Sequence, residues 1–241
     1  HEPEIDGFEW LHGAAVVWHN GRLFASFGHN KGKENTAGEE AKWRVSGDGG
    51  RTWGPVRLID RGDDPDLAVS HGVFLSRDGE LWAFHGAFTG SMEDVHTRAY
   101  RFDDAAETWV HKGKVVGQGF WPMQSPLLLR DGSYIMAGFR AESGNPPALA
   151  ISGSDLLQWR LVTIPIADGM NVWGESTIVR RPDRVLNIAR FSAPLALVSE
   201  SRDGGGTWTT LRETNLPMAA SKPYSGTLST GHAYLIGSSS A

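Results

Sequence analysis

Ser201-Arg202-Asp203-Gly204-Gly205-Gly206-Thr207-Trp208 carries the pattern Ser-x-Asp-x-Gly-x-Thr-Trp, which we call the box. An earlier copy of the box runs from Ser46 through Asp48 and Thr52 to Trp53. Partial copies at 102–109 and 152–159 keep the final tryptophan, so the four tryptophans (53, 109, 159 and 208) are 56, 50 and 49 residues apart. A period near fifty residues indicates a repeat architecture.

The box has the chemistry of a tight turn. Asp-Gly followed by a second Gly supplies the positive φ angles of a hairpin turn. The carboxylate and the hydroxyls can satisfy turn amides, and the tryptophan can pack against the strands. We therefore interpret the boxes as structural and predict a β-propeller with one four-stranded blade per repeat.

Each repeat also carries a hairpin pattern of apolar run, turn and apolar run ahead of its box. The five predicted hairpins are 14–27, 73–84, 127–137, 177–188 and 227–236. We expect one all-β propeller domain over residues 1–241, with repeats at roughly 11–58, 70–115, 123–165 and 174–213 and a partial repeat at 223–241. Because the fifth repeat lacks a box, we expect an incomplete array of about five blades from a six-bladed type, with seven blades as the alternative.

Composition excludes several classes of function. The net charge is −5 with no basic run, which argues against nucleic-acid binding. The absence of cysteine removes disulfides and thiolate metal sites, and no apolar run is long enough to span a bilayer. We expect no cofactor. No signal peptide is recognised, and we read the start at His1 as a mature end or the cut end of a longer chain.

Superposing the hairpins places five chemically active residues at equivalent positions before the first strand, each followed by Gly or Ser. These are His12, His71, Gln124, Glu175 and Tyr224. In a propeller the first strands run in the same sense around the axis, so we expect these residues at one mouth of the central channel. The second strands return to that mouth with His29, His85, Arg140 and Arg190.

We interpret this polar ring as a substrate site, and two alternative interpretations remain open. The side chains could satisfy backbone groups beside a water-filled channel. Alternatively, His12, His71, His85 and Glu175 could hold Zn or Ca, although no short ligand motif is present and we expect no metal. Two arginines in a chain of negative net charge favour a carboxylate or sulfate ligand, because guanidinium binds such groups in a bidentate manner.

The box repeats resemble the Asp-box repeats of the sialidases and related propeller proteins. The run from Trp173 through Glu175 to Val179, followed by Arg190 and then the box at 201–208, looks like the fourth-blade pattern of that family. The resemblance implies that Glu175 polarises a tyrosine nucleophile and that Arg190 holds the substrate carboxylate. The segment 26–35 resembles the loop that carries the sialidase acid/base aspartate.

The chain also departs from the sialidase pattern. His12 stands where the family has the first arginine of its triad, and the acid/base region reads Gly28-His29-Asn30-Lys31 without an aspartate. In the family, the third arginine and the nucleophilic tyrosine belong to later blades. Tyr224 begins a suitable strand one blade earlier.

A second resemblance is to propeller polysaccharide lyases that act on uronate glycans, in which His and Tyr act as base and acid and Arg neutralises the uronate. His71, His85 and Arg140, with Gln124 or Tyr224, are similar to that set. We therefore expect an extracellular or periplasmic enzyme that cleaves a glycosidic bond next to an acidic sugar, as a sialidase-like exo-glycosidase. The alternatives are a uronate-glycan lyase and a non-catalytic glycan-binding propeller, and in each case the expected partner is an acidic glycan or oligosaccharide.

Overall fold

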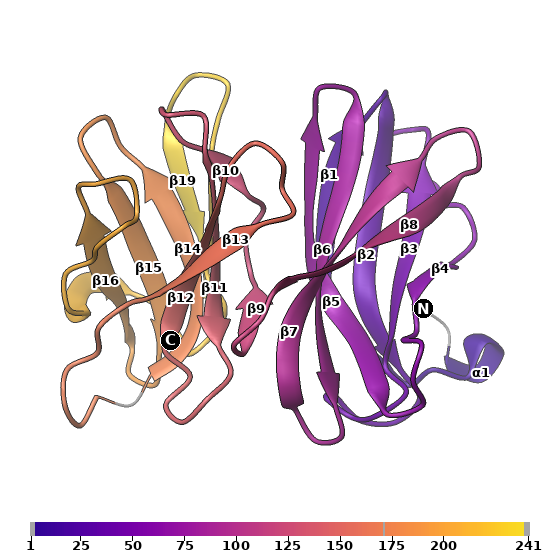
Figure 1. Ribbon diagram of the computed structural model, residues 1–241, viewed down its shortest axis with the longest axis horizontal. Coiled ribbons are helices and arrows are strands. Elements are labelled where there is room, and N and C mark those ends of the chain that lie inside the picture. Colours follow the sequence, from indigo (N-terminus) through magenta and orange to yellow (C-terminus); the bar gives the residue numbers. More distant parts are fainter. Residues whose placement is uncertain (1–2, 171, 239–241) are drawn as a thin grey trace. The chain divides into compact units, whose positions relative to one another are not determined.

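The computed structural model describes residues 3–170 and 172–238, and nearly all of its regular structure is β-strand (Figure 1). One short helix, α1 (Pro3–Asp6), precedes the strands. The chain separates into two compact units at Trp121/Pro122. Each unit is described by itself.

The first unit contains two four-stranded antiparallel blades, with strand orders β1-β2-β3-β4 and β5-β6-β7-β8. The bounds in the first blade are β1 (Trp10–His19), β2 (Arg22–Asn30), β3 (Glu40–Ser46) and β4 (Arg57–Asp60). Those in the second blade are β5 (Leu67–Arg77), β6 (Glu80–Thr89), β7 (Glu93–Asp103) and β8 (Thr108–Val116). Strand β9 (Phe120–Pro122) lies at the division between the units.

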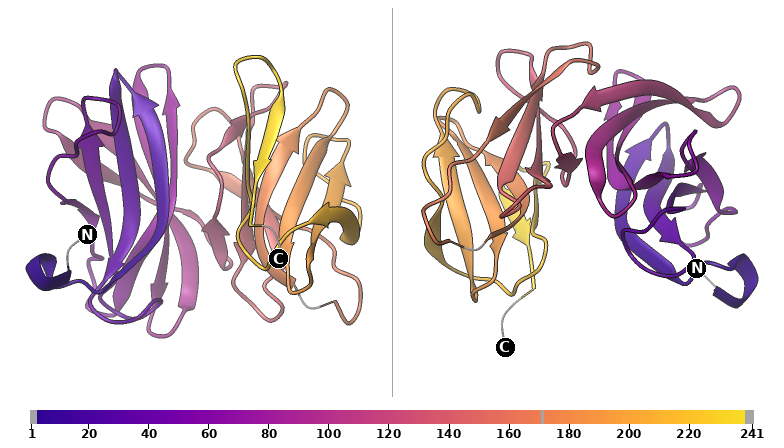
Figure 2. Two further views of the ribbon diagram at one scale, coloured as in Figure 1. Left: turned by 180° about the vertical axis from the view of Figure 1, so that it is seen from behind. Right: turned by 60° about the horizontal axis from the view of Figure 1, so that its bottom comes forward.

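The second unit contains two further blades, with orders β10-β11-β12-β13 and β14-β15-β16-β17, and the hairpin β18-β19. The bounds in the third blade are β10 (Leu127–Leu128), β11 (Tyr134–Arg140), β12 (Pro147–Ser152) and β13 (Trp159–Thr163). Those of the remaining strands are β14 (Val172–Arg180), β15 (Val185–Phe191), β16 (Leu195–Ser201), β17 (Arg212–Pro217), β18 (Tyr224–Thr227) and β19 (Ala233–Ile236). The β18-β19 hairpin lies beside β14 (Figure 2), where the backbone N–H of Ser225 donates to the Thr177 hydroxyl at 2.9 Å.

Each unit has its own apolar core between its blades. In the first unit Phe24 stacks on Trp43 at 5.6 Å, and both rings contact Phe102 edge-on. In the second unit the buried aliphatic side chains of the third blade pack against those of the fourth, and Trp208 covers this cluster. Burial of these faces supplies the main driving force for folding.

The two complete boxes form the expected turns. Asp203 accepts hydrogen bonds from the backbone N–H of Thr207 at 2.9 Å and from its hydroxyl at 2.7 Å, and Ser201 donates to the same carboxyl at 2.8 Å. These bonds lower the pKa of Asp203 to about 2. Asp48 makes the corresponding bonds with Ser46 and Thr52. The box therefore satisfies its turn through contacts within eight residues of sequence.

The predicted all-β, sialidase-like propeller class is confirmed, with four blades and the additional β18-β19 hairpin. All five predicted hairpins are present. The predicted starts of three first strands are wrong, because β1, β5 and β14 begin at Trp10, Leu67 and Val172, four to six residues before 14, 73 and 177. The extension of one domain over residues 1–241 stays a prediction. Among the described residues, no helix has the length and apolarity needed to span a membrane.

Candidate functional site

The first strands of three blades are interrupted by bulges, and candidate site residues lie at these interruptions. In β1 the pairing breaks after His12 and resumes at Ala15. In β5 it breaks between Val69 and Gly72, so Ser70 and His71 lie in the bulge. In β14 it breaks between Val172 and Ser176, and the bulge contains Glu175. A bulge redirects side chains that would otherwise alternate strictly along the strand.

In the first unit the bulges bring His12 and His71 together, with ring centroids 4.6 Å apart in an edge-on arrangement. Gly13 permits this approach, because a Cβ at that position would lie 2.1 Å from the His71 ring, and its φ of 61° is in the left-handed region. His12 also lies 3.0 Å from a carboxylate oxygen of Glu34, and its side chain is 37% exposed. His71 is only 4% exposed. The pair therefore has one partly open member and one buried member.

A chain of hydrogen bonds extends behind His71. The Ser70 hydroxyl donates to buried Glu39, and the Nδ1 atom of His71 lies 3.1 Å from the same hydroxyl oxygen. Burial raises the pKa of Glu39, and its hydrogen bond with Ser70 opposes that shift. When Glu39 is ionised, Ser70 gives its one proton to the carboxylate, so His71 must donate from Nδ1. The neutral ring then carries its lone pair on Nε2, as a general base requires.

The other two predicted histidines of this unit are interior side chains. The Nδ1 atom of His85 donates to the carbonyl oxygen of Ser70 at 2.7 Å, and the whole residue is buried. Burial lowers the pKa of His85 to about 4, so the ring is neutral at physiological pH. His29 is also buried and stacks on Phe8 with ring centroids 4.1 Å apart. Both rings therefore support the site from inside the blades and do not line an open surface.

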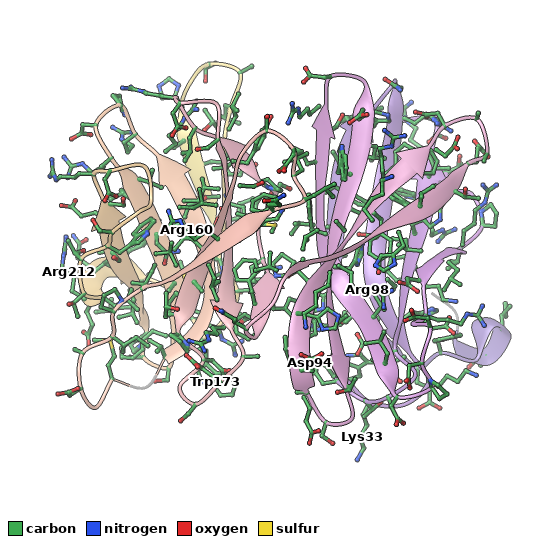
Figure 3. All side chains as sticks on the ribbon, in the orientation of Figure 1. Lys33, Asp94, Arg98, Arg160, Trp173 and Arg212 are labelled. Atoms are coloured by element: carbon green, nitrogen blue, oxygen red, sulfur yellow. The ribbon has the colours of Figure 1, made fainter. Side chains whose placement is uncertain are left out.

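In the second unit the β14 bulge places Glu175 against Arg190, and the two side chains form an ion pair. The Arg190 guanidinium also lies over the Trp173 ring, 5.1 Å from its centroid. Trp173 is 49% exposed and lies at the lower end of this unit in Figure 3. The close packing needs Gly174, because a Cβ there would lie 1.9 Å from the carbonyl oxygen of Asn145.

Lys222 contributes a second cation near Glu175. Burial lowers the pKa of Lys222, and the charge of Glu175 opposes that shift. Tyr224, which begins β18, is 38% exposed. Burial raises the pKa of its hydroxyl, and a hydrogen bond with Ser125 opposes the shift. Glu175 is thus ion-paired with Arg190, and its charge also favours the protonated form of Lys222.

Gln124 is bonded entirely to neighbouring backbone and to Ser225. Its amide nitrogen donates to the carbonyl oxygens of Ile178 at 3.1 Å and Ser225 at 2.8 Å, and its amide oxygen accepts from the Ile178 N–H at 2.6 Å. These contacts join the segment before β10 to β14 and β18, which is a structural role. Arg140, at the end of β11, forms an ion pair with Glu142 at 3.2 Å.

Four of the predicted residues thus form two pairs, one in each unit. His12 and His71 lie together in the first, while Glu175 and Arg190 lie together in the second. No motif in the sequence points to Glu39, Ser70 or Lys222. Ser70 and Lys222 are close in sequence to predicted residues, whereas Glu39 lies between the predicted hairpin 14–27 and the first box. No group of three or more His, Cys, Asp or Glu side chains in residues 3–170 and 172–238 is arranged to hold a metal ion.

Comparison with known proteins identifies the fold and the family. The family model described as "BNR repeat-like domain" matches residues 72–240 of this chain. The search of curated proteins gives no match. Solved structures with the same fold include a protein of unknown function from Dyadobacter fermentans, with a TM-score of 0.74 and 16% identity over 95% of this chain and 75% of that one.

Two other similar structures are glycoside hydrolases by name. The Hadza microbial sialidase has a TM-score of 0.72 and 17% identity, and the match covers 95% of this chain and 53% of the sialidase. A family 117 glycoside hydrolase from Zobellia galactanivorans has a TM-score of 0.64 and 15% identity, over 93% of this chain and 76% of that enzyme. The chain thus spans about half the length of the sialidase that it matches. It belongs to the BNR repeat-like domain family and has the fold of a sialidase-like β-propeller.

Proposed function

We propose that this protein is a carbohydrate-active enzyme that hydrolyses a glycosidic bond next to an acidic sugar, as a sialidase-like exo-glycosidase acting outside the cytoplasm. The observation that carries the proposal is the Glu175–Arg190 pair beside Lys222 and Trp173. The glycoside hydrolases among the similar structures support the same class of substrate.

The charges of this group suit a sugar carboxylate. Arg190 offers a planar guanidinium that can bind a carboxylate in a bidentate manner, and Lys222 adds a second positive charge. The Nε atom of Arg190 is buried without a hydrogen-bond partner among the described residues, which is uncommon for a guanidinium donor. The exposed face of Trp173 offers an apolar surface to a sugar ring.

Glu175 is the proposed base in this group. In the resemblance to sialidases, the equivalent glutamate polarises a tyrosine, and Tyr224 is the tyrosine at the start of the neighbouring strand β18. Since burial raises the pKa of Tyr224, its hydroxyl needs a base to become a nucleophile at neutral pH. Arg190 and Lys222 hold the substrate while Glu175 accepts the proton.

Two substitutions test these roles. Glu175→Gln should abolish release of reducing sugar and leave ligand affinity within about threefold, because the amide keeps the shape of the side chain but removes the base. Arg190→Lys should weaken binding about tenfold or more, because an ammonium lacks the two parallel donors. Arg212→Lys, on exposed β17, is the matched control and should change neither. Full turnover by Glu175→Gln would refute the assignment.

A uronate-glycan lyase is the second candidate, favoured by the chain from Glu39 through Ser70 to His71. Removal of a proton next to a carboxylate needs a base with its lone pair held in place, and when Glu39 is ionised this chain of hydrogen bonds fixes the lone pair of His71 on Nε2. In that case His71→Ala should lower the rate by ~10²–10⁴. The product would absorb as an unsaturated uronate, whereas hydrolysis gives no such absorbance. Binding without turnover by the parent on either substrate would instead assign a non-catalytic glycan-binding protein.

A further inference from the structure

A cleft lies at the end of the β14-β15 hairpin that is away from Glu175. Its volume is about 270 Å³, and its walls are three turns of the second unit: 129–131, 180–185 and 202–204. These turns follow β10, β14 and β16. Glu175 lies near the start of β14 and Arg180 at its end, so about 16 Å of extended strand separates the two sites.

Arginine dominates the lining of this cleft. Five guanidinium groups face three carboxylates, although the whole chain has a net charge of −5. The arginines are Arg130, Arg180, Arg181, Arg184 and Arg202, and the acids are Asp131, Asp183 and Asp203. Such a concentration of one charge raises the local concentration of counter-ions.

The acids of the cleft are already engaged. Asp131 accepts from the Ser133 hydroxyl at 2.6 Å, and Asp203 is bonded within its box turn. Asp183 forms an ion pair with Arg184 at 2.9 Å. Glu200, just outside, pairs with Arg184 at 2.9 Å and with Arg202 at 3.4 Å. Two of the five arginines therefore have carboxylate partners.

The other three arginines have no carboxylate partner among the described residues. Arg180 donates to the carbonyl oxygen of Leu128, a neutral acceptor. Arg130 and Arg181 are exposed, and neither side chain pairs with any group in residues 3–170 and 172–238. Because these three come from two different turns, their donors can approach one anion from different directions.

We propose that this cleft binds a tetrahedral oxyanion, specifically the sulfate ester of a sulfated glycan. A tetrahedral group presents acceptor oxygens in several directions, whereas a carboxylate presents two in one plane, so it suits guanidinium groups from separate turns. A phosphate ester shares this chemistry and is distinguished by experiment. The site would hold a sulfated polymer at the end of the blades opposite the Glu175 group, and it does not depend on what Glu175 and Arg190 do.

The test measures binding of dextran sulfate by titration calorimetry, with neutral dextran, inorganic sulfate and inorganic phosphate as comparison probes. Arg130→Gln and Arg181→Gln should each weaken dextran sulfate binding about tenfold, the usual effect of losing one charge-assisted contact. Arg160→Gln and Arg212→Gln are matched controls, because both arginines are exposed on outer strands of the same unit and lie outside the cleft (Figure 3). They should retain the parent affinity.

The proposal also predicts the order of the probes. Dextran sulfate should bind more tightly than either inorganic ion, and neutral dextran should not bind. Equal losses in the cleft and control variants would show a general charge effect and overturn the site. Tighter binding of inorganic phosphate than of dextran sulfate would overturn the sulfated-glycan assignment. Turnover of small acidic glycosides should be unchanged in Arg130→Gln. The experiment therefore distinguishes a failure of sulfate binding at the cleft from a failure of the proposed enzyme activity.

Discussion

The substitution Gln124→Met measures how much the hydrogen bonds of Gln124 contribute to the stability of the second unit. Methionine keeps the length and volume of the side chain but has no N–H donor and only a weak sulfur acceptor. The residue is 1% exposed, so water cannot take the place of the lost partners. The substitution therefore removes the hydrogen bonds to Ile178 and Ser225 without opening a large cavity.

The expected cost follows from the groups left behind. The Ile178 N–H loses its side-chain acceptor at 2.6 Å, and the carbonyl oxygen of Ser225 loses a donor at 2.8 Å. The carbonyl oxygen of Ile178 keeps a second donor, the Ser225 hydroxyl at 2.8 Å. Two buried backbone groups are thus left without this partner, at about 1–3 kcal/mol each. We expect the free energy of unfolding to fall by about 2–6 kcal/mol.

Urea denaturation followed by tryptophan fluorescence measures this loss. Gln158→Met, at an exposed position of the same unit, is the matched control and should change the free energy of unfolding by less than about 0.5 kcal/mol. A loss below about 1 kcal/mol for Gln124→Met would refute the structural role. Weaker glycan binding with unchanged stability would instead support the original prediction that Gln124 contacts the substrate.

Two further predictions concern single side chains. Asp203→Ala should lower the free energy of unfolding by about 1–2 kcal/mol, because it removes three hydrogen bonds of the box turn, and Arg202→Ala on the same turn provides a control in the same urea assay. The buried neutral ring of His85 should make the protein less stable in acid. The pKa of His85 is lowered from 6.5 in the unfolded chain to about 4 in the folded protein. The neutral ring therefore contributes fully to the free energy of unfolding above pH 6.5. As the pH falls toward 4, about 3 kcal/mol of that free energy is lost. A His85→Gln variant whose urea midpoint declines between pH 6.5 and 4 as steeply as the parent's would contradict this assignment.

The fold could be predicted because its signals are local. Ser201, Asp203 and Thr207 bond to one another within one turn, so the spacing of the box in the sequence already contains the geometry. The Glu175–Arg190 pair could also be anticipated, since a hairpin brings these residues opposite each other. Glu39 could not, because its contact with Ser70 joins residues 31 positions apart in different blades. No local pattern encodes that contact.

The bulges explain why the predicted starts of the first strands were wrong. A pattern of alternating residues describes a regular strand, and the first strands lose that regularity at Ser70-His71 and at Trp173-Gly174-Glu175, each run lying opposite a single residue of the next strand. Regular alternation is visible only after each bulge, so the sequence predicts that the strand starts there. In the structure the strand continues through the interruption, and the interruption turns His71 toward His12 and Glu175 toward Arg190. The same local irregularity that hid the strand boundary is thus the feature that positions the chemically active side chains.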